Sequence, residues 1–182
     1  MSKNVDRFYI VTGGPGSGKS AALNALRKRG CAISIEAGRG VIQEQVAISG
    51  EALPWKNPAL FAELMLGWEM RNYRMAEEQP GIVIFDRGVP DILGYLRLMN
   101  IDAPSHVITA THRFRYNPRV FIAPPWPEIF EQDAERKQDV EEAERTYEAM
   151  VTVYAELGYA LIELPRLPVE ERAVFMMSRM NM

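Results

Sequence analysis

The sequence predicts an α/β protein in which one parallel β-sheet lies between two layers of helices, a three-layer sandwich. Short apolar runs alternate with amphipathic helical segments along the chain, and glycine or proline separates many of them. A glycine-rich loop joins the first apolar run to the first helical segment. Strands that are separated by helices pair in parallel, because each crossover returns the chain to the same edge of the sheet.

Five apolar runs have the length and the flanking residues of buried strands. The third run follows Pro80 and Gly81, the fourth ends at Pro124, and the fifth ends at Pro165. The predicted strands cover residues 8–12, 31–35, 82–85, 119–123 and 160–164.

Apolar residues at helical spacing occupy the intervals between these strands. Gly30 stops the first helical pattern and Gly158 stops a long one near the end of the chain, as expected for glycine just beyond a helix. The predicted helices cover residues 20–29, 58–79, 90–99, 105–115, 139–157 and 169–180.

The chain has the size of one domain. Its 182 residues are 47% hydrophobic and 25% charged, which is enough apolar material for a core without disulfides or structural metals. Cys31 is the only cysteine, so it has no partner for an internal disulfide. We expect residues 1–182 to form a single nucleotide-binding domain, with residues 40–79 as a helical insertion beside the substrate.

The charge balance argues against nucleic acids and membranes as partners. Lys and Arg total 21 against 24 Asp and Glu, a net charge of -3, and no basic stripe is present. The apolar stretches are too short for a membrane span, and the first fifteen residues do not resemble a secretory signal. We therefore expect a cytoplasmic protein.

Residues 13–20 carry the strongest chemical signal, because they fit the pattern G-x-x-x-x-G-K-[ST] between a strand and a helix. Glycines allow successive backbone N–H groups to converge on a polyphosphate at a helix N-terminus. We expect Lys19 to reach the β- and γ-phosphates of ATP and the hydroxyl of Ser20 to bind Mg²⁺. The predicted nucleotide-binding residues are Gly13, Gly14, Pro15, Gly16, Ser17, Gly18, Lys19, Ser20 and Ala21.

A P-loop also needs a carboxylate for the metal, usually at the end of a neighbouring strand. Asp86 directly follows the apolar run 82–85, and Arg87 comes next. Asp86 would bind Mg²⁺ through water or accept a hydrogen bond from Ser20, and the planar fork of Arg87 suits phosphate oxygens. The alternative is that the pair only caps a strand or the following helix.

The P-loop and the Asp86-Arg87 pair together resemble the nucleoside and nucleotide kinase branch of P-loop proteins. The downstream segments 116–126 (YNPRVFIAPPW) and 132–137 (QDAERK) more closely resemble small bacterial AAA-type ATPase-domain proteins, a group related to the kinase domain that phosphorylates nicotinamide riboside. The resemblance extends from Phe8 to the last helix. It implies a sheet in the order 2-3-1-4-5, with the Asp86 strand next to the P-loop strand.

The resemblance also implies further site residues. A lid at about residues 126–145 would carry Arg136 to the γ-phosphate of ATP, although a charged helical run is also typical of a solvated surface. Glu36, after the second strand, would face the acceptor hydroxyl and take its proton, while Arg39 and Arg87 hold the substrate. The glycines on either side of Arg39 would equally suit an ordinary loop.

Aromatic residues between the second and third strands have two interpretations. They could line an acceptor pocket together with Arg71 and Arg74, but aromatics at helical spacing are more often part of a core, and we favour the core. These residues are Trp55, Phe61, Trp68 and Tyr73.

Three functions fit the sequence. The first is a small-molecule kinase that transfers the γ-phosphoryl group of ATP, with Lys19, Asp86, Arg87, Arg136 and Glu36 as catalytic residues and Mg²⁺ as cofactor. The second is a regulatory ATPase that acts through a protein partner bound to residues 40–79. The third is a kinase of nucleic-acid ends, which the acidic composition disfavours.

Overall fold

The computed structural model describes residues 5–129 and 140–180. Its five strands form one parallel sheet in the order β2-β3-β1-β4-β5, which confirms the order that the resemblance implied. The strands are β1 (Phe8–Gly13), β2 (Ala32–Ile33), β3 (Val83–Asp86), β4 (Arg119–Ala123) and β5 (Ala160–Glu163).

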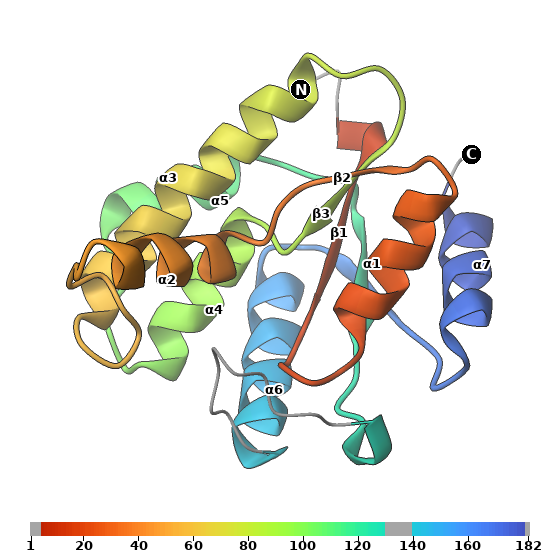
Figure 1. Cartoon of the computed structure of the whole chain (residues 1–182). Coiled ribbons are helices and arrows are strands. Elements are labelled where there is room, and N and C mark those ends of the chain that lie inside the picture. Colours follow the sequence, from red (N-terminus) through yellow and green to blue (C-terminus); the bar gives the residue numbers. More distant parts are fainter. Residues whose placement is uncertain (1–4, 130–139, 181–182) are drawn as a thin grey trace.

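Helices cover both faces of the sheet, so the predicted three-layer sandwich is confirmed (Figure 1). Helices α1 (Lys19–Lys28) and α7 (Val169–Arg179) pack together on one face. The remaining helices lie on the other side of the molecule in Figure 1. They are α2 (Ala37–Ala47), α3 (Pro58–Glu77), α4 (Val89–Leu98), α5 (Ser105–Arg113) and α6 (Val140–Glu156), with short 3₁₀ turns at Val5–Arg7 and Pro127–Ile129. None of the described helices is long and apolar enough to cross a membrane.

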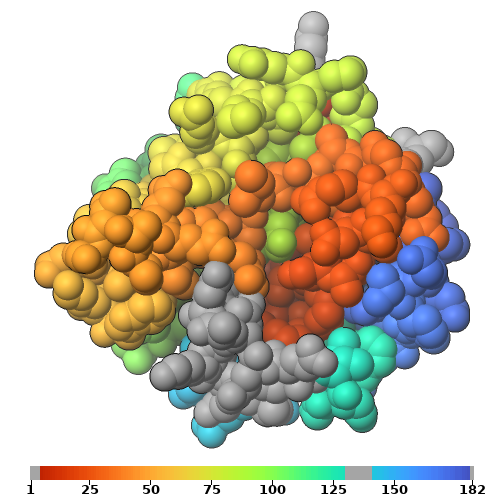
Figure 2. All heavy atoms as spheres, in the orientation of Figure 1, coloured from red at the N-terminus to blue at the C-terminus, as the bar shows by residue number. Residues whose placement is uncertain are grey.

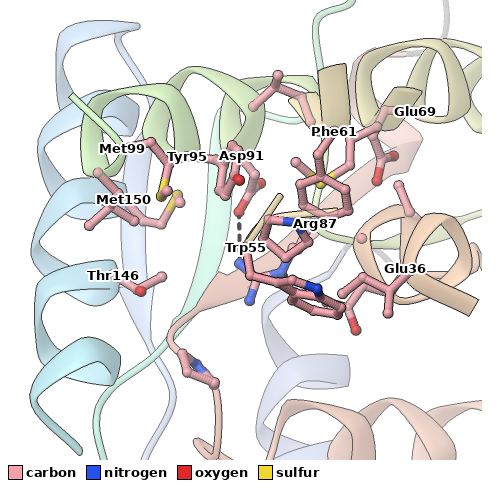
Figure 3. A pocket seen from close by; sticks show the side chains of 18 of the residues that line it. Glu36, Trp55, Phe61, Glu69, Arg87, Asp91, Tyr95, Met99, Thr146 and Met150 are labelled. Carbon is pink, nitrogen blue, oxygen red and sulfur yellow. Dashed lines mark hydrogen bonds and ion pairs between the residues drawn. The ribbon is translucent and has the colours of Figure 1, made fainter. Parts of the chain in front are cut away.

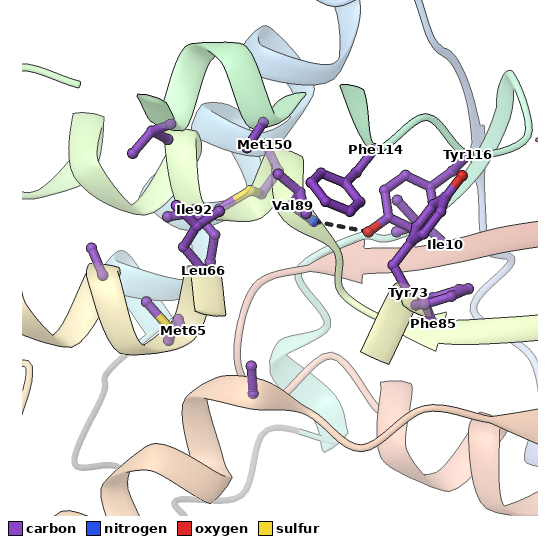
Figure 4. Close-up of a cluster of buried hydrophobic side chains, with 14 of the residues drawn as sticks. Ile10, Met65, Leu66, Tyr73, Phe85, Val89, Ile92, Phe114, Tyr116 and Met150 are labelled. Atoms are coloured by element: carbon purple, nitrogen blue, oxygen red, sulfur yellow. Dashed lines mark hydrogen bonds between the residues drawn. The ribbon is translucent and has the colours of Figure 1, made fainter. Parts of the chain in front are cut away.

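Alternate residues of β1 supply two separate cores, as the two-residue repeat of a strand requires. Tyr9 and Val11 face α1 and α7, whereas Phe8 and Ile10 face the larger cluster under α3, α4 and α6. Aromatic rings fill the centre of that larger cluster (Figure 4), where the ring of Phe85 lies 5.1 Å from that of Tyr116. These contacts hold the sheet against the helices that carry the candidate site.

The register of the sheet determines where the glycine-rich loop begins. Val11 lies opposite Asp86 on β3, and Gly13 lies opposite Ala123 on β4. A Cβ atom on Gly13 would lie 2.4 Å from the carbonyl oxygen of Ala123, and the φ angle of Gly13 is +127°. Only glycine allows β1 to leave the sheet at this point.

Two segments differ from the predicted elements. Strand β2 is shorter than the predicted 31–35, because it lies at the sheet edge and pairs only with β3, and Ile35 is exposed. Residues 38–40 belong to α2 rather than to a loop, although their glycines weaken helix propensity. Gly40 is packed so closely that an added Cβ would lie 2.6 Å from the ring of Trp68.

The central aromatic cluster makes a testable contribution to stability. Phe85 is fully buried, so Phe85→Ala should lower the free energy of unfolding by about 3–5 kcal/mol, through lost apolar burial and the cavity that remains. Urea denaturation measures this change. Leu60→Ala, at a position that is 42% exposed, should change the value by less than about 0.5 kcal/mol. Equal effects of the two substitutions would contradict this account of the core.

Candidate active site

The loop between β1 and α1 is closed by its own hydrogen bonds. Gly16 and Gly18 adopt left-handed conformations, with φ angles of +67° and +74°. The Ser17 hydroxyl donates to the carbonyl of Gly14 at 2.8 Å. The ammonium group of Lys19 donates to the carbonyl oxygens of Gly14 at 2.8 Å and Gly13 at 3.2 Å. The loop therefore holds a buried positive charge at the N-terminus of α1, where an anion is favoured.

Arg172, on α7, hydrogen-bonds to the backbone of this loop. Its guanidinium donates to the carbonyl of Gly18 at 3.2 Å and lies 5.2 Å from the ring centre of Trp126. Arg172 is 3% exposed, and this burial lowers its pKa. The sequence analysis missed Arg172, because it stands in the first turn of an amphipathic helix and belongs to no motif.

Arg87 follows β3 in a strained conformation. Its φ angle is +71°, a left-handed value that residues other than glycine rarely adopt. Its backbone N–H donates to the carbonyl of Val11 at 3.0 Å, so the turn is fixed to β1. The backbone N–H of Asp86 donates to the hydroxyl of Ser34 at 3.1 Å. Backbone strain of this kind is concentrated at functional sites.

The side chain of Arg87 joins two carboxylates from different elements. Its Nε lies 3.3 Å from Glu36 Oε1, and its Nη1 lies 3.3 Å from Asp91 Oδ1. Arg39 approaches the other oxygen of Glu36 at 3.9 Å. Burial opposes the charge on Arg87, but the nearby carboxylates outweigh it and raise the pKa of Arg87 above its ordinary value. Arg87 is therefore a permanent cation at the end of β3.

Asp91 anchors this arrangement to the surrounding helices and to β1. Its carboxylate accepts hydrogen bonds from the Thr12 hydroxyl at 2.5 Å, from the Tyr154 hydroxyl at 2.5 Å and from the Gly88 backbone at 2.9 Å. Asp91 is 4% exposed. These contacts fix the orientation of the carboxylate that holds Arg87, and the sequence analysis did not include Asp91 in the site.

A pocket of about 1070 Å³ opens beside this cluster and touches the glycine-rich loop at Pro15. In Figure 2 a hollow separates the orange surface around α2 from the red surface of the loop and α1, with green atoms of a later segment at its floor. Its lining contains acidic and basic side chains together with apolar side chains from α2, α3, α4 and α6. Figure 3 labels Glu36, Trp55, Phe61, Glu69, Arg87, Asp91, Tyr95, Met99, Thr146 and Met150 around it.

The structure brings several predicted residues together at this pocket. Glu36, Arg87 and Pro15 line it, and Arg39 lies beside Glu36. Asp86 ends β3 at the same edge of the sheet, while Ser20 and Ala21 lie in the exposed first turn of α1. Arg136 lies outside the described residues.

The aromatic residues divide between the two interpretations. Trp55 and Phe61 line the pocket, whereas Tyr73 is buried in the larger core and Trp68 packs against it. The pocket also contains residues that sequence reasoning missed. Glu69 on α3, Tyr95 on α4 and Met150 on α6 all line it, and no local pattern marks them.

The strand order and the glycine-rich loop are those of a P-loop nucleotide-binding fold. A family model for the AAA domain matches residues 8–172. The chain therefore belongs to this AAA domain family. Among curated proteins, none matches the chain by sequence.

Solved structures, two of them of kinases, share this fold. A deoxyadenosine kinase from M. mycoides superposes with a TM-score of 0.69 at 16% identity, over 96% of this chain and 98% of that chain. The NadR protein in complex with NR superposes with a TM-score of 0.71 at 17% identity, over 97% of this chain and 52% of that chain. A thymidylate kinase from Ehrlichia chaffeensis has a TM-score of 0.60 at 15% identity, over 97% and 99% of the two chains.

The anchor at Asp91 can be tested by removing one hydroxyl. Tyr154→Phe should lower the free energy of unfolding by about 1.5–3 kcal/mol, because the hydrogen bond to a buried carboxylate is lost. Tyr147, on the same helix, donates to Glu163 at an exposed position, so Tyr147→Phe should cost less than about 1 kcal/mol. Urea denaturation compares the two variants, and a cost for Tyr154→Phe no larger than for Tyr147→Phe would refute the anchoring role.

Proposed function

We propose that this protein is an ATP-dependent small-molecule kinase that transfers the γ-phosphoryl group to a hydroxyl of a nucleoside-like acceptor. The observation that carries the proposal is the cluster of Glu36, Arg87 and Asp91 at the end of a large pocket that adjoins the glycine-rich loop. A nucleotide site and an acceptor site then share one edge of the sheet, as in-line phosphoryl transfer requires.

On the nucleotide side, the loop 13–20 binds the phosphates of ATP. Lys19 exchanges its carbonyl contacts for the β- and γ-phosphate oxygens. The Ser20 hydroxyl and the Asp86 carboxylate are hard oxygen ligands of the kind that Mg²⁺ prefers, so the donor set fits this metal. When bound, Mg²⁺ neutralises charge on the β- and γ-phosphates.

On the acceptor side, Glu36 receives the proton of the attacking hydroxyl. The hydroxyl oxygen forms a bond to the γ-phosphorus while the bond from that phosphorus to the bridging oxygen breaks, and the electron pair stays on ADP. Arg87 and Arg39 hold the carboxylate of Glu36 in position. Arg87 also offers its charge to the transferred phosphoryl group.

The charges of the pocket favour a hydroxyl over a phosphate as the acceptor group. The described lining residues include four carboxyl groups and two guanidinium groups, and the carboxyl groups still outnumber the guanidinium groups, three against two, when Glu69, whose pKa is raised by burial, is left out. A bound phosphate monoester would add two negative charges to this surface, which like-charge repulsion opposes. The carboxyl groups belong to Glu36, Glu69, Asp91 and Glu142, and the guanidinium groups to Arg87 and Arg145.

The fold relatives are consistent with a nucleoside-like acceptor. One is named as a deoxyadenosine kinase and another binds NR. Aromatic side chains such as Trp55 and Phe61 in the lining suit a planar ring.

We propose that Arg136, in the lid at about residues 126–145, closes over the γ-phosphate. Glu142 and Arg145, from the start of α6, already line the pocket.

The second candidate is a regulatory ATPase that acts through a protein partner. Exposed apolar side chains near α2 favour it, because they suit a partner surface. Ile48 is 71% exposed and Trp55 is 64% exposed. In that case, turnover would depend on the partner and not on any small acceptor.

The nucleotide site can be tested by thermal denaturation. At about 100 times its Kd, a Mg·ATP analogue should stabilise the native state by about 2.7 kcal/mol and raise Tm by roughly 5–10 °C. Lys19→Ala should remove most of this shift, because the phosphates lose their charged partner. Lys28→Ala, at the other end of the same helix, should keep it. An undiminished shift in Lys19→Ala would refute phosphate binding by this loop.

The acceptor site can be tested by phosphoryl transfer to a panel of nucleosides. An accepted nucleoside should accelerate ADP release and appear as its monophosphate. Glu36→Gln should slow this transfer by about 10²-fold or more and leave the background ATP hydrolysis in place, because water does not depend on this base. Glu44→Gln, on the exposed face of α2, is the control.

Two results would contradict the kinase proposal. The first is a Glu36→Gln variant that transfers phosphate at the wild-type rate. The second is ATP turnover that no acceptor changes but a protein partner increases, which would favour the regulatory ATPase.

A further inference from the structure

Glu69 is a buried carboxyl group in the wall of the acceptor pocket. It stands in the middle of α3, is 1% exposed and lines the pocket together with Phe61 and Met65 of the same helix. Figure 3 shows it on the same side of the pocket as Glu36. Within the described part of the chain its one hydrogen bond comes from the Asn72 amide, at 3.4 Å. Buried polar groups are normally well hydrogen-bonded, so a buried carboxyl group with one long hydrogen bond needs a further hydrogen-bond partner.

The surroundings of Glu69 do not offer it a cation of its own. Arg87, which lines the same pocket, already pairs with Glu36 and Asp91. The titratable groups that interact with Glu69 from the neighbouring elements are Glu36, Asp86, Asp91 and Tyr116.

These surroundings disfavour the charged form of Glu69. Burial raises the pKa of Glu69 well above its usual value, the negative charges of Asp91, Asp86 and Glu36 raise it further, and the hydrogen bond from Asn72 acts in the opposite direction. A protonated carboxyl carries one O–H donor beside one carbonyl acceptor.

We propose that Glu69 is a specificity-determining residue that recognises the substrate which receives the phosphoryl group. It would form two hydrogen bonds with one edge of that substrate, where a hydrogen-bond donor lies beside a hydrogen-bond acceptor, as in a lactam, carboxamide or amidine. This inference rests on the proposed kinase function. Phe61 and Met65 provide an apolar surface for the ring that carries this edge. A compound without the edge would leave a buried carboxyl unpaired, which is how a polar group in a pocket rejects an analogue.

Two substitutions separate an uncharged Glu69 from an ionised one. Glutamine also presents a donor beside an acceptor, so Glu69→Gln should keep KM for the accepted nucleoside within about threefold. Glu69→Leu should raise KM at least about tenfold, with a smaller change in kcat. The probes are inosine, uridine, adenosine and nicotinamide riboside, assayed with Mg·ATP. A tenfold rise of KM in Glu69→Gln would show that Glu69 binds as a carboxylate and would overturn the proposal.

Methylated nucleosides test the same contact from the side of the ligand. N1-methylinosine and N3-methyluridine lack the ring N–H of the lactam. With the wild-type protein their KM should rise at least about tenfold over the parent nucleosides, and with Glu69→Leu the difference should vanish. Equal KM values for parent and methylated compounds on the wild type would refute recognition of this edge.

The protonation of Glu69 can be measured without any acceptor. Because its folded pKa lies above the unfolded value, the folded state binds the proton more tightly, and this stability is lost as pH rises from the unfolded towards the folded pKa. Glutamine does not titrate. The Tm of Glu69→Gln should therefore exceed that of the wild type by a margin that grows by at least about 3 °C between about pH 5 and about pH 8.

Glu78→Gln, at the exposed end of α3, is the control for loss of one negative charge. If the difference in Tm between Glu69→Gln and the wild type changes with pH no more than the difference for Glu78→Gln, Glu69 is not held uncharged. If the pH margin appears but none of the probes is phosphorylated, the kinase proposal fails for these nucleosides and the ligand assignment fails with it. If a probe is phosphorylated but Glu69→Leu binds it normally, only the role of Glu69 is refuted.

Discussion

The organisation of this site depends on one buried guanidinium. Arg87 leaves β3 with a left-handed backbone and binds Glu36 from the start of α2 and Asp91 from α4. Without it, carboxylates from separate elements would face one another in a poorly solvated pocket, where like charges repel strongly. Asp91 is itself held by Thr12 on β1 and Tyr154 on α6. The cation and its carboxylates therefore connect five elements around the pocket, namely β1, β3, α2, α4 and α6.

The sheet brings this cluster and the glycine-rich loop to one edge. Strand β1 ends in the loop and β3 ends in Asp86-Arg87, and these strands are neighbours in parallel register. The Arg87 backbone is bonded to β1, while Arg172 on α7 supports the loop from the opposite layer. Both layers of helices thus contribute to one site. The half that we propose binds phosphate depends on backbone conformation, and the pocket half depends on side chains drawn from distant segments.

How much of this the sequence could predict follows from how local each feature is. The loop 13–20 and the Asp86-Arg87 pair depend on consecutive residues, so a pattern in one segment reveals them, and alternating strands and helices reveal the sheet. The start of helix α2 was not predicted, since Gly40 weakens a helix and is explained only by its contact with Trp68. Glu69 looks like an ordinary polar position in a helix until the fold buries it.

The central claim is that Arg87 organises the acceptor half of the site while the glycine-rich loop binds the nucleotide. The most direct measurement is the rate of phosphoryl transfer by Arg87→Lys at saturating Mg·ATP, because lysine keeps the charge but lacks the planar fork that reaches both carboxylates. The account predicts a fall of about 10²-fold or more in this rate, with nucleotide affinity within about threefold of the wild type. A transfer rate near that of the wild type would contradict it.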